Sequence, residues 1–250
     1  MDYNNLLTGK TVFISTAAAG MGKDIALLFA QQGATVVIGG RDQQLLNKTV
    51  AEIQSISPKS KGYLCDLSIR EETENACSQA LKDFGTIDIL VNTVGVNVRG
   101  LSHEYEEETL EKLLETNYKS GLRCAKKFIP EMLKKKKGNI INISSIHSVM
   151  TMPTNLIYAG TKGAMNASAR AMALDYAKEG IRVNTICPGL IMSDAIISEI
   201  QGYKEGKERD EFMNLLKNMQ PLEIGTMRDV SNLALFLASD MSNYITGQTI

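Results

Sequence analysis

The chain has 250 residues, and its 27 lysines and arginines nearly balance its 28 aspartates and glutamates. The formal net charge of −1 gives no general attraction to nucleic acid or to an anionic membrane, so we expect neither as a partner. Hydrophobic residues make up 44% of the chain, which excludes wholesale disorder. This length and composition support one α/β domain over residues 1–250.

Cysteine usage and the first residues bear on the compartment. The chain has four cysteines far apart in sequence, at Cys65, Cys77, Cys124 and Cys187. None belongs to a C-x-x-C pair, so we expect no metal site. Residues 1–5 lack the basic and apolar regions of a secretory signal, and no apolar run approaches the ~20 residues of a membrane span. We therefore expect a cytoplasmic protein with free thiols.

Short apolar runs alternate with longer segments of helical spacing. In chain order, the pattern predicts a strand at Thr11–Ser15, a helix from about Met21 to Gln32, a strand at Thr35–Ile38, a helix at Gln43–Ile56, a strand at Gly62–Cys65, a helix at Glu71–Phe84, a strand at Ile87–Val91, a helix from about Leu110 to Lys135, a strand at Asn139–Ile143, a helix at Tyr158–Lys178, a strand at Arg182–Ile186, a helix near Val230–Ala238 and a strand starting at Gln248. Strands separated by such helices form parallel β-α-β units. The sequence predicts a doubly wound parallel sheet of about seven strands flanked by helices, with ligands at the carboxyl ends of the strands.

Two segments stand outside this alternation. Lys134 to Lys137 form the one basic run, and we assign it to a helix C-terminus, where cations meet a favourable dipole. The segment from Leu190 to about Met219 has no such pattern and is charged in its second half. Because segments of that length in compact domains are usually functional, we expect a mobile helical lid over the site at about 190–219.

The turn after the first strand carries the first functional signal. Residues 15–22 read S-T-A-A-A-G-M-G, and small residues there let the backbone approach a pyrophosphate at the N-terminus of the next helix. Packing alone also produces such turns, and the strict G-x-G-x-x-G fingerprint is absent. The turn by itself therefore leaves nucleotide binding and packing as equal alternatives.

The ends of the second and third strands bear on which dinucleotide binds. Gly39-Gly40-Arg41 offers a guanidinium and no carboxylate where an NAD-binding fold usually has an acidic residue. This favours NADP(H), with NAD(H) as the alternative; the other interpretation of Arg41 is an exposed side chain beside a helix-starting Asp42. Asp66 fits either an acceptor for the adenine amino group or the N-cap of the next helix.

The strongest chemical signal is the spacing of Tyr158 and Lys162. On a helix they lie one turn apart on one face, and the cation would lower the pKa of the phenol toward the range of acid–base catalysis. An isolated Y-x-x-x-K match is weak. Here Ser145 lies thirteen residues upstream at the end of a predicted strand, and Asn117 lies in T-N-Y-K-S-G, on a helix that can face the same edge.

Together these motifs resemble the single-domain branch of the short-chain dehydrogenase/reductase family, from about Leu7 to the last residue. The resemblance implies a Rossmann fold and a catalytic tetrad of Asn117, Ser145, Tyr158 and Lys162. By that resemblance, Tyr158 exchanges the substrate proton and Ser145 hydrogen-bonds the carbonyl oxygen, while Lys162 holds the nicotinamide ribose and Asn117 a relay water. It implies hydride transfer between NADP(H) and a carbonyl or secondary alcohol.

The small-residue turn at residues 15–22, the ends of the second and third strands and the family resemblance together predict a set of cofactor contacts. They are Ser15, Thr16, Ala18, Gly20, Met21, Gly40, Arg41, Asp66, Leu67, Asn92, Gly95, Pro188, Gly189, Ile191 and Ser193. Within this set, the resemblance implies a sheet-stabilising role for Asn92 and contacts to the nicotinamide carboxamide for the segment that begins at Pro188.

The sequence departs from the family pattern at several positions. Thr16 replaces the first glycine of T-G-x-x-x-G-x-G, the usual N-N-A-G reads Asn92-Thr93-Val94-Gly95, and Ser148 stands where a glycine often follows the catalytic serine. The chain stops at Ile250 without the family's V-D-G-G-like tail, which commonly helps to build the tetramer. We expect a homotetramer or a homodimer.

The substrate side is expected to be apolar and adaptable. Residues 146–153 and 190–192 supply it, and the expected contacts are His147, Met152 and Leu190. The alternative for His147 is a hydrogen bond to the local backbone. These features do not choose among hydrophobic ketones, hydroxysteroids, sugar acids and acyl-thioester ketones.

Two other functions compete with this prediction. A catalytically idle dinucleotide-binding regulator or scaffold is supported by Thr16, but such a protein has no need of the complete tetrad. An epimerase or dehydratase of the extended relatives carries an added substrate domain, for which 250 residues leave no room.

Overall fold

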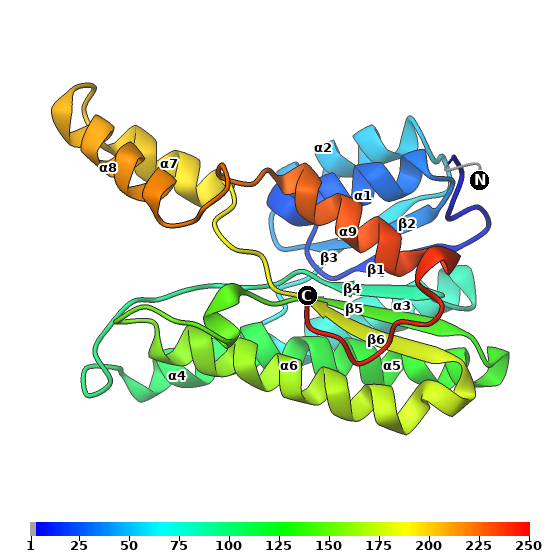
Figure 1. The fold of residues 1–250 in the computed structure, drawn as a ribbon. Coiled ribbons are helices and arrows are strands. Elements are labelled where there is room, and N and C mark those ends of the chain that lie inside the picture. The colour runs from blue at the N-terminus through cyan, green and yellow to red at the C-terminus, as the bar shows by residue number, and fades with distance from the viewer. Residues whose placement is uncertain (1–3) are drawn as a thin grey trace.

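The computed structural model describes residues 4–250, and a six-stranded parallel sheet lies at its centre (Figure 1). Residues 1–3, which belong to the stretch where we expect no secretory signal, lie outside the described residues. The strands are β1 (Thr11–Ile14), β2 (Thr35–Gly40), β3 (Lys61–Leu64), β4 (Ile89–Asn92), β5 (Gly138–Ile143) and β6 (Ile181–Ile186). The helices are α1 (Gly20–Gln31), α2 (Gln43–Gln54), α3 (Arg70–Phe84), α4 (Glu107–Leu114), α5 (Ser120–Lys135), α6 (Leu156–Tyr176), α7 (Asp194–Gly202), α8 (Lys207–Asn218) and α9 (Met227–Ala238).

The strand order β3-β2-β1-β4-β5-β6 fixes where a ligand can enter. From β1 the chain winds outward through β2 to β3, then crosses back to β4 and winds outward the other way. In the register, Phe13 of β1 lies opposite Val37 of β2 and Leu90 of β4. The winding reverses between β1 and β4, and at such a point the connections leaving the strands diverge and open a crevice.

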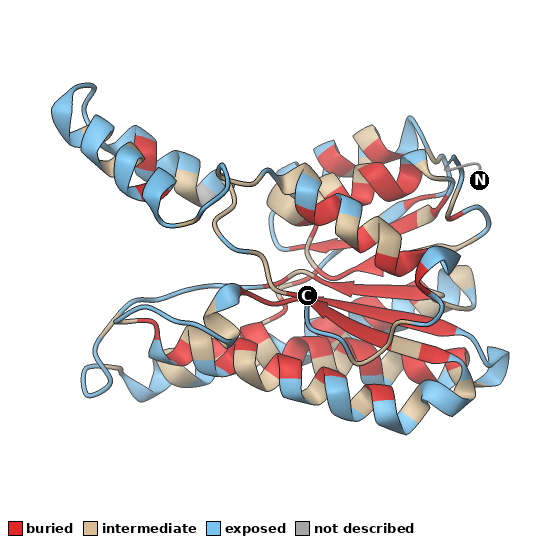
Figure 2. Ribbon diagram, in the orientation of Figure 1, coloured by how far each residue is buried: buried red, intermediate tan, exposed pale blue. Residues whose placement is uncertain are grey.

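The sheet is covered by helices on both faces, which explains its nearly uninterrupted apolar strands. All six residues of β5 and all four of β4 are buried. Helices α1, α2 and α9 pack on one face, and α3, α5 and α6 pack on the other. Figure 2 shows burial concentrated in the strands and on the inner sides of these helices, whereas the projecting α7–α8 pair is mostly exposed.

The predicted doubly wound fold is confirmed, but the strand count is six and not about seven. The segment expected to form a last strand from Gln248 makes a single bridge, between Thr249 and Thr185. Gly247, with φ of 73°, turns the chain just before this bridge, and Thr185 pairs with the Gln248 carbonyl and the Ile250 amide. Among residues 4–250, no helix is both long and apolar enough to cross a membrane.

Three helical segments refine the predictions made from the sequence. The helix predicted from about Leu110 to Lys135 is α4 and α5, joined by a π-helical turn at Glu115–Lys119. The basic run does close a helix, since α5 ends at Lys135 and Lys136 takes a left-handed conformation with φ of 49°. Residues 190–219 hold α7 and α8, which project away from the body of the fold.

Candidate active site

Tyr158 and Lys162 meet on the first turns of α6. The Lys162 Nζ lies 5.7 Å from the centroid of the Tyr158 ring. Nζ also donates hydrogen bonds to the carbonyl oxygens of Val94 (3.1 Å), in the loop after β4, and of Ile143 (2.9 Å), the last residue of β5. The side chain is buried, and burial lowers the pKa of its ammonium to about 8. Lys162 is thus held rigidly at the switch-point edge of the sheet.

The phenol of Tyr158 does not have the lowered pKa that the sequence suggested. Burial raises its pKa above the ordinary value, and a hydrogen bond with the Ser145 side chain acts in the opposite direction without cancelling this effect. Lys162 approaches the ring and turns its ammonium toward the two carbonyls, which explains why it does not offset the burial. At neutral pH Tyr158 is therefore a protonated phenol, the form that donates a proton.

Ser145 sits where β5 ends and the chain turns toward α6. Its backbone is extended, and its hydroxyl accepts a hydrogen bond from the amide of His147 at 3.2 Å, so it caps the short 3-10 turn Ile146–Ser148. This contact fixes the side chain while leaving it against Tyr158. The serine and tyrosine hydroxyls are therefore brought together, as the tetrad requires.

Because Gly95 has no side chain, Lys162 has room to reach this position. A Cβ placed on Gly95 would lie 2.9 Å from the Lys162 Nζ and 3.3 Å from its Cε. Any side chain at position 95 would therefore press on a buried ammonium that is already fixed by two carbonyls. The glycine also lines the cleft beside the site, so it leaves open the approach from the cleft to Lys162.

Asn117 lies in the π-helical turn and is fully buried. Its Oδ1 accepts from the Val96 amide at 2.8 Å, and its Nδ2 donates to the Val96 carbonyl at 2.8 Å and to the Thr161 hydroxyl at 3.3 Å. Asn117 thereby ties the loop after β4 to α6. π-Helical turns inside α-helices often mark functional positions, because the extra residue changes the direction of a side chain.

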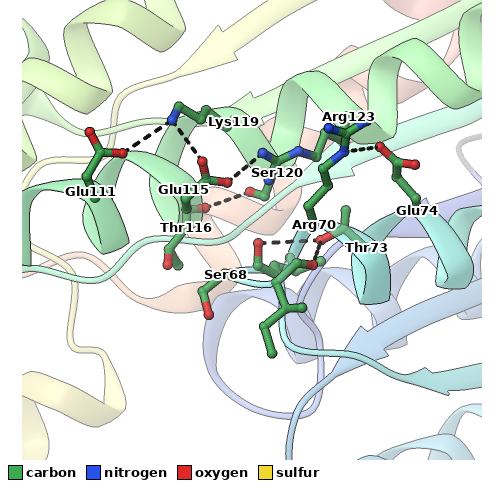
Figure 3. A network of polar contacts seen from close by, with 12 residues as sticks. Ser68, Arg70, Thr73, Glu74, Glu111, Glu115, Thr116, Lys119, Ser120 and Arg123 are labelled. Carbon is green, nitrogen blue, oxygen red and sulfur yellow. Dashed lines mark hydrogen bonds and ion pairs between the residues drawn. The ribbon is translucent and has the colours of Figure 1, made fainter. Parts of the chain in front are cut away.

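Charged residues brace this π-helical turn from the outside (Figure 3). Lys119 pairs with Glu115 at 2.8 Å and with Glu111 at 3.5 Å, and Arg123 pairs with Glu115 as well. Glu115 stands at the start of the turn, so it links the turn to the first helical turn of α5. These ion pairs connect α4, the π-helical turn and α5 next to Asn117.

A cleft of about 360 Å³ opens at the switch point beside the tetrad. Nine of the expected cofactor contacts line it: Thr16, Ala18, Gly20, Met21, Gly40, Arg41, Asp66, Leu67 and Gly95. The N-terminus of α1 meets this cleft without a side-chain cap and without an acidic residue in its first turn. A Cβ on Gly22 would overlap the Thr16 carbonyl oxygen, so the tight turn depends on that glycine.

Six expected cofactor contacts lie outside this cleft: Ser15, Asn92, Pro188, Gly189, Ile191 and Ser193. Ser15 is buried and accepts from the Thr93 amide at 3.0 Å. Asn92 is buried and donates to Asn142 across the sheet at 2.8 Å, which agrees with a sheet-stabilising role. The hydroxyl of Ser193 caps α7 by accepting from the Ile196 amide at 3.4 Å.

The two residues that bear on cofactor choice differ in their surroundings. Arg41 is exposed at the cleft and forms no ion pair with any described residue, while Asp42 caps α2 as expected. Asp66 does not cap α3, because that helix begins after Ile69. Burial raises the pKa of Asp66, but hydrogen bonds from Ser68 outweigh it, and Arg41 lowers the pKa further. Asp66 is thus an ionised acceptor at the cleft wall.

Sequence reasoning missed several residues of the cleft: Ala19, Gly22, Asp42, Leu45, Cys65, Thr93, Val94, Val96 and Thr116. Most of them adjoin expected contacts in the sequence. Thr116 comes from the π-helical turn next to Asn117, and no periodicity could have placed it there. Across residues 4–250, no group of three or more His, Cys, Asp or Glu is arranged to hold a metal ion.

The expected substrate contacts gather less closely. His147 lies edge-on to the Tyr158 ring, with ring centroids 5.8 Å apart, and its Nδ1 is 3.0 Å from the Thr151 hydroxyl. Burial lowers the pKa of His147, and the charge of Arg99 adds to this effect, so the imidazole is neutral at pH 7. Met152 is exposed nearby, whereas Leu190 donates its amide to the Gln220 side chain at 3.1 Å at the base of the projecting helices.

Comparison with known proteins places this geometry in a family. Residues 16–250 match a family model described as enoyl-(acyl carrier protein) reductase. An uncharacterised oxidoreductase of Bacillus subtilis, YxbG, is 36% identical over 247 residues, which cover 98% of this chain and 89% of that protein. The match extends over almost the whole length of both chains.

Two solved structures agree in fold as well. A 7α-hydroxysteroid dehydrogenase complexed with NADH and 7-oxo glycochenodeoxycholic acid superimposes with a TM-score of 0.91 at 30% identity, covering 100% of this chain and 95% of the other. ElxO with NADP bound superimposes with a TM-score of 0.87 at 28% identity, covering 96% of each chain. The chain belongs to the short-chain dehydrogenase/reductase family and is an NAD(P)-dependent oxidoreductase acting on CH–OH or carbonyl groups.

Proposed function

We propose that this enzyme transfers hydride between NADP(H) and the carbonyl or secondary alcohol of an apolar substrate, with Tyr158 as the proton-exchanging residue. The observation that carries the proposal is the meeting of three groups at one edge of the cleft. These are the Tyr158 phenol, the Ser145 hydroxyl and the buried Lys162 ammonium. A protein that only binds a dinucleotide has no use for the Tyr158 phenol and the Ser145 hydroxyl held against each other at this edge.

The cleft fits a nicotinamide dinucleotide on its own residues. The uncapped N-terminus of α1 offers backbone amides to a pyrophosphate, and Gly22 permits the tight turn that brings the loop to this N-terminus. Gly95 leaves room between the cleft and Lys162, whose remaining N–H is free to bind ribose hydroxyls. A bound dinucleotide supplies or accepts the hydride at this site.

The residues of the chain then handle the proton and the charge. In carbonyl reduction, the Ser145 hydroxyl binds the substrate oxygen and Tyr158 donates its proton as negative charge develops there. Lys162 stabilises the phenolate that Tyr158 becomes, since its Nζ is 5.7 Å from the ring centroid. Asn117 connects the loop after β4 to α6, which carries Tyr158 and Lys162, and so fixes the position of these two side chains relative to the cleft. In alcohol oxidation the same steps run in reverse.

Arg41 supports a preference for NADP(H). Its guanidinium lies at the cleft beside Gly40 and is not engaged in an ion pair with a described residue, so it is available to bind a 2′-phosphate. Asp66 on the same wall accepts hydrogen bonds and suits the adenine amino group. NAD(H) remains the alternative cofactor.

Exposed apolar side chains next to Ser145 support an apolar substrate. Val149, Met150 and Met152 are 69%, 71% and 51% exposed in the segment between Ser145 and α6. Leu215 and Leu222 are exposed on or beside the projecting α8. We propose that α7 and α8 act as a lid that covers such a substrate. We also propose a homo-oligomer, either a tetramer or a dimer, and Leu174, which is 85% exposed on α6, suits its interface.

A cofactor and substrate panel tests the proposed function. Cyclic ketones, acyl-thioester ketones and sugar lactones are each offered with NADPH and, separately, with NADH, and loss of the reduced cofactor is followed by absorbance. We expect turnover of at least one apolar carbonyl compound and a lower KM for NADPH than for NADH. Faster turnover with NADH would overturn the NADP preference. Dinucleotide binding without turnover of any substrate, in either direction, would support the idle regulator instead.

A further inference from the structure

Two of the departures from the family pattern are direct neighbours in space. Thr16 follows β1, and Thr93 follows β4, so each stands at the end of one of the two strands that flank the switch point. Both residues line the cleft. The positions are 77 residues apart in the chain, and nothing in the sequence connects them.

The two threonines share three close polar contacts. The Thr93 hydroxyl donates to the Thr16 carbonyl at 2.7 Å and accepts from the Thr16 amide at 3.0 Å. The two hydroxyl oxygens are also 3.0 Å apart. Thr93 therefore binds both backbone groups of Thr16 as well as its side chain.

Counting protons assigns the direction of the third contact. A hydroxyl has one proton and two lone pairs. Because Thr93 uses its proton on the Thr16 carbonyl, the contact between the hydroxyls has Thr16 as its donor. The Thr93 oxygen is then saturated. The Thr16 oxygen keeps two free lone pairs and no free proton at the cleft, so it can only accept.

We propose that Thr93 is a positioning residue for the cofactor, which holds the loop after β1 to the end of β4 and presents the Thr16 hydroxyl oxygen as a hydrogen-bond acceptor. This inference rests on the proposed function, because it takes the ligand of the cleft to be a dinucleotide. An acceptor suits a ribose hydroxyl of the adenosine half and repels a phosphate oxygen. Thr49 secures the other side of the same loop by donating to the Ala18 carbonyl at 2.8 Å.

The proposal predicts an order of effects among isosteric variants. Thr93→Val removes all three contacts while it keeps the branched shape, and it should raise the dissociation constant for NADPH about tenfold. Thr16→Val loses only the acceptor and its bond to Thr93, and it should raise that constant by a smaller factor. Thr93→Ser keeps the hydroxyl and should restore affinity to within about threefold of wild type. The Thr16→Val/Thr93→Val double variant should bind about as weakly as Thr93→Val alone, because the Thr16 hydroxyl depends on its partner.

The experiment measures NADPH affinity by fluorescence titration, KM for NADPH, kcat at saturating NADPH, and the thermal midpoint of each full-length variant. Thr86→Val is the matched control, since the Thr86 hydroxyl has no partner among the described residues. It should leave NADPH affinity, KM and kcat unchanged and should not lower the thermal midpoint, because it removes a buried hydroxyl without a partner. In the Thr16 and Thr93 variants, KM for NADPH should rise by the same factor as the dissociation constant, and kcat should change by less than about threefold.

Two results would overturn the proposal. One is unchanged NADPH affinity in Thr93→Val with the fold intact; the other is strictly additive effects of the two valine substitutions. Failure of the proposed function gives a different result, because the wild-type protein itself would then bind no NADPH or turn over no substrate, whereas failure of this inference leaves both properties of the wild type intact. If Thr93→Val does not fold, Thr93→Ser and Thr16→Val still decide the question, since the first should bind NADPH more tightly than the second.

Discussion

The Lys162 ammonium lies 5.7 Å from the centroid of the Tyr158 ring and donates hydrogen bonds to one carbonyl in the loop after β4 and to another at the end of β5. Burial acts on the two side chains in opposite senses. It raises the pKa of the phenol and lowers the pKa of the ammonium to about 8. Near pH 7 the pair therefore consists of a neutral proton donor and a cation, which is the state required for carbonyl reduction.

The first prediction concerns the pH dependence of reduction. Lys162 stays charged below its pKa of about 8 and becomes neutral above it, so the stabilisation of the developing phenolate is lost as pH rises. We expect kcat for carbonyl reduction to be flat from about pH 6 to pH 7.5 and to fall by about tenfold per unit well above pH 8. The measurement is kcat at saturating substrate and NADPH across this range. A kcat that rises steadily to pH 10 would contradict this reading of the pair.

The second prediction concerns the space that Gly95 leaves for Lys162. In Gly95→Ala the new Cβ would lie 2.9 Å from Nζ, so the ammonium must move from its two carbonyl acceptors. We expect kcat to fall by roughly 10- to 100-fold with the fold retained. Gly160→Ala is the matched control, because a Cβ there meets nothing within 4 Å and the helix gains an alanine. Equal activities of the two variants would show that the close approach is unimportant.

The third prediction concerns cofactor choice. Arg41→Asp replaces a cleft cation by an anion, which should repel a 2′-phosphate and accept from a ribose hydroxyl. We expect the ratio of kcat/KM for NADPH to that for NADH to fall by at least about tenfold. Lys178→Asp makes the same change of charge on an exposed residue that does not line the cleft, and it should leave the ratio unchanged. An unchanged ratio in Arg41→Asp would mean that another residue binds the phosphate.

The sequence predicts the parts of this fold that depend on periodicity and on short motifs. The alternation of apolar runs and helical segments placed all six strands to within a few residues, and the spacing of Tyr158 and Lys162 placed them on one helix face. The strand predicted from Gln248 is instead a single bridge between Thr249 and Thr185, and the composition of a short segment does not distinguish the two. The π-helical turn at Asn117 was also missed: its extra residue shifts the apolar stripe by about 100° between α4 and α5, but no motif in the sequence marks the turn.

Pairings between distant positions are what the sequence could not supply. Thr16 and Ser148 both looked like defects in the motif, but each finds partners far away in the chain. Thr16 binds Thr93, and Ser148 accepts from the Asn166 side chain at 2.8 Å. The pKa of Tyr158 was misjudged for the same reason: burial of the ring depends on packing, which spacing along a helix does not reveal.

The most direct test of the account compares Tyr158→Phe with Tyr244→Phe, which removes a phenolic hydroxyl from a fully exposed position. Both the kcat for a substrate found in the panel and the dissociation constant for NADPH are measured. Because only Tyr158 is placed to donate the substrate proton, Tyr158→Phe should lower kcat by about 10³-fold and leave NADPH affinity within about threefold of wild type, while Tyr244→Phe changes neither. A Tyr158→Phe enzyme that turns over as fast as wild type would contradict the assignment of the proton donor.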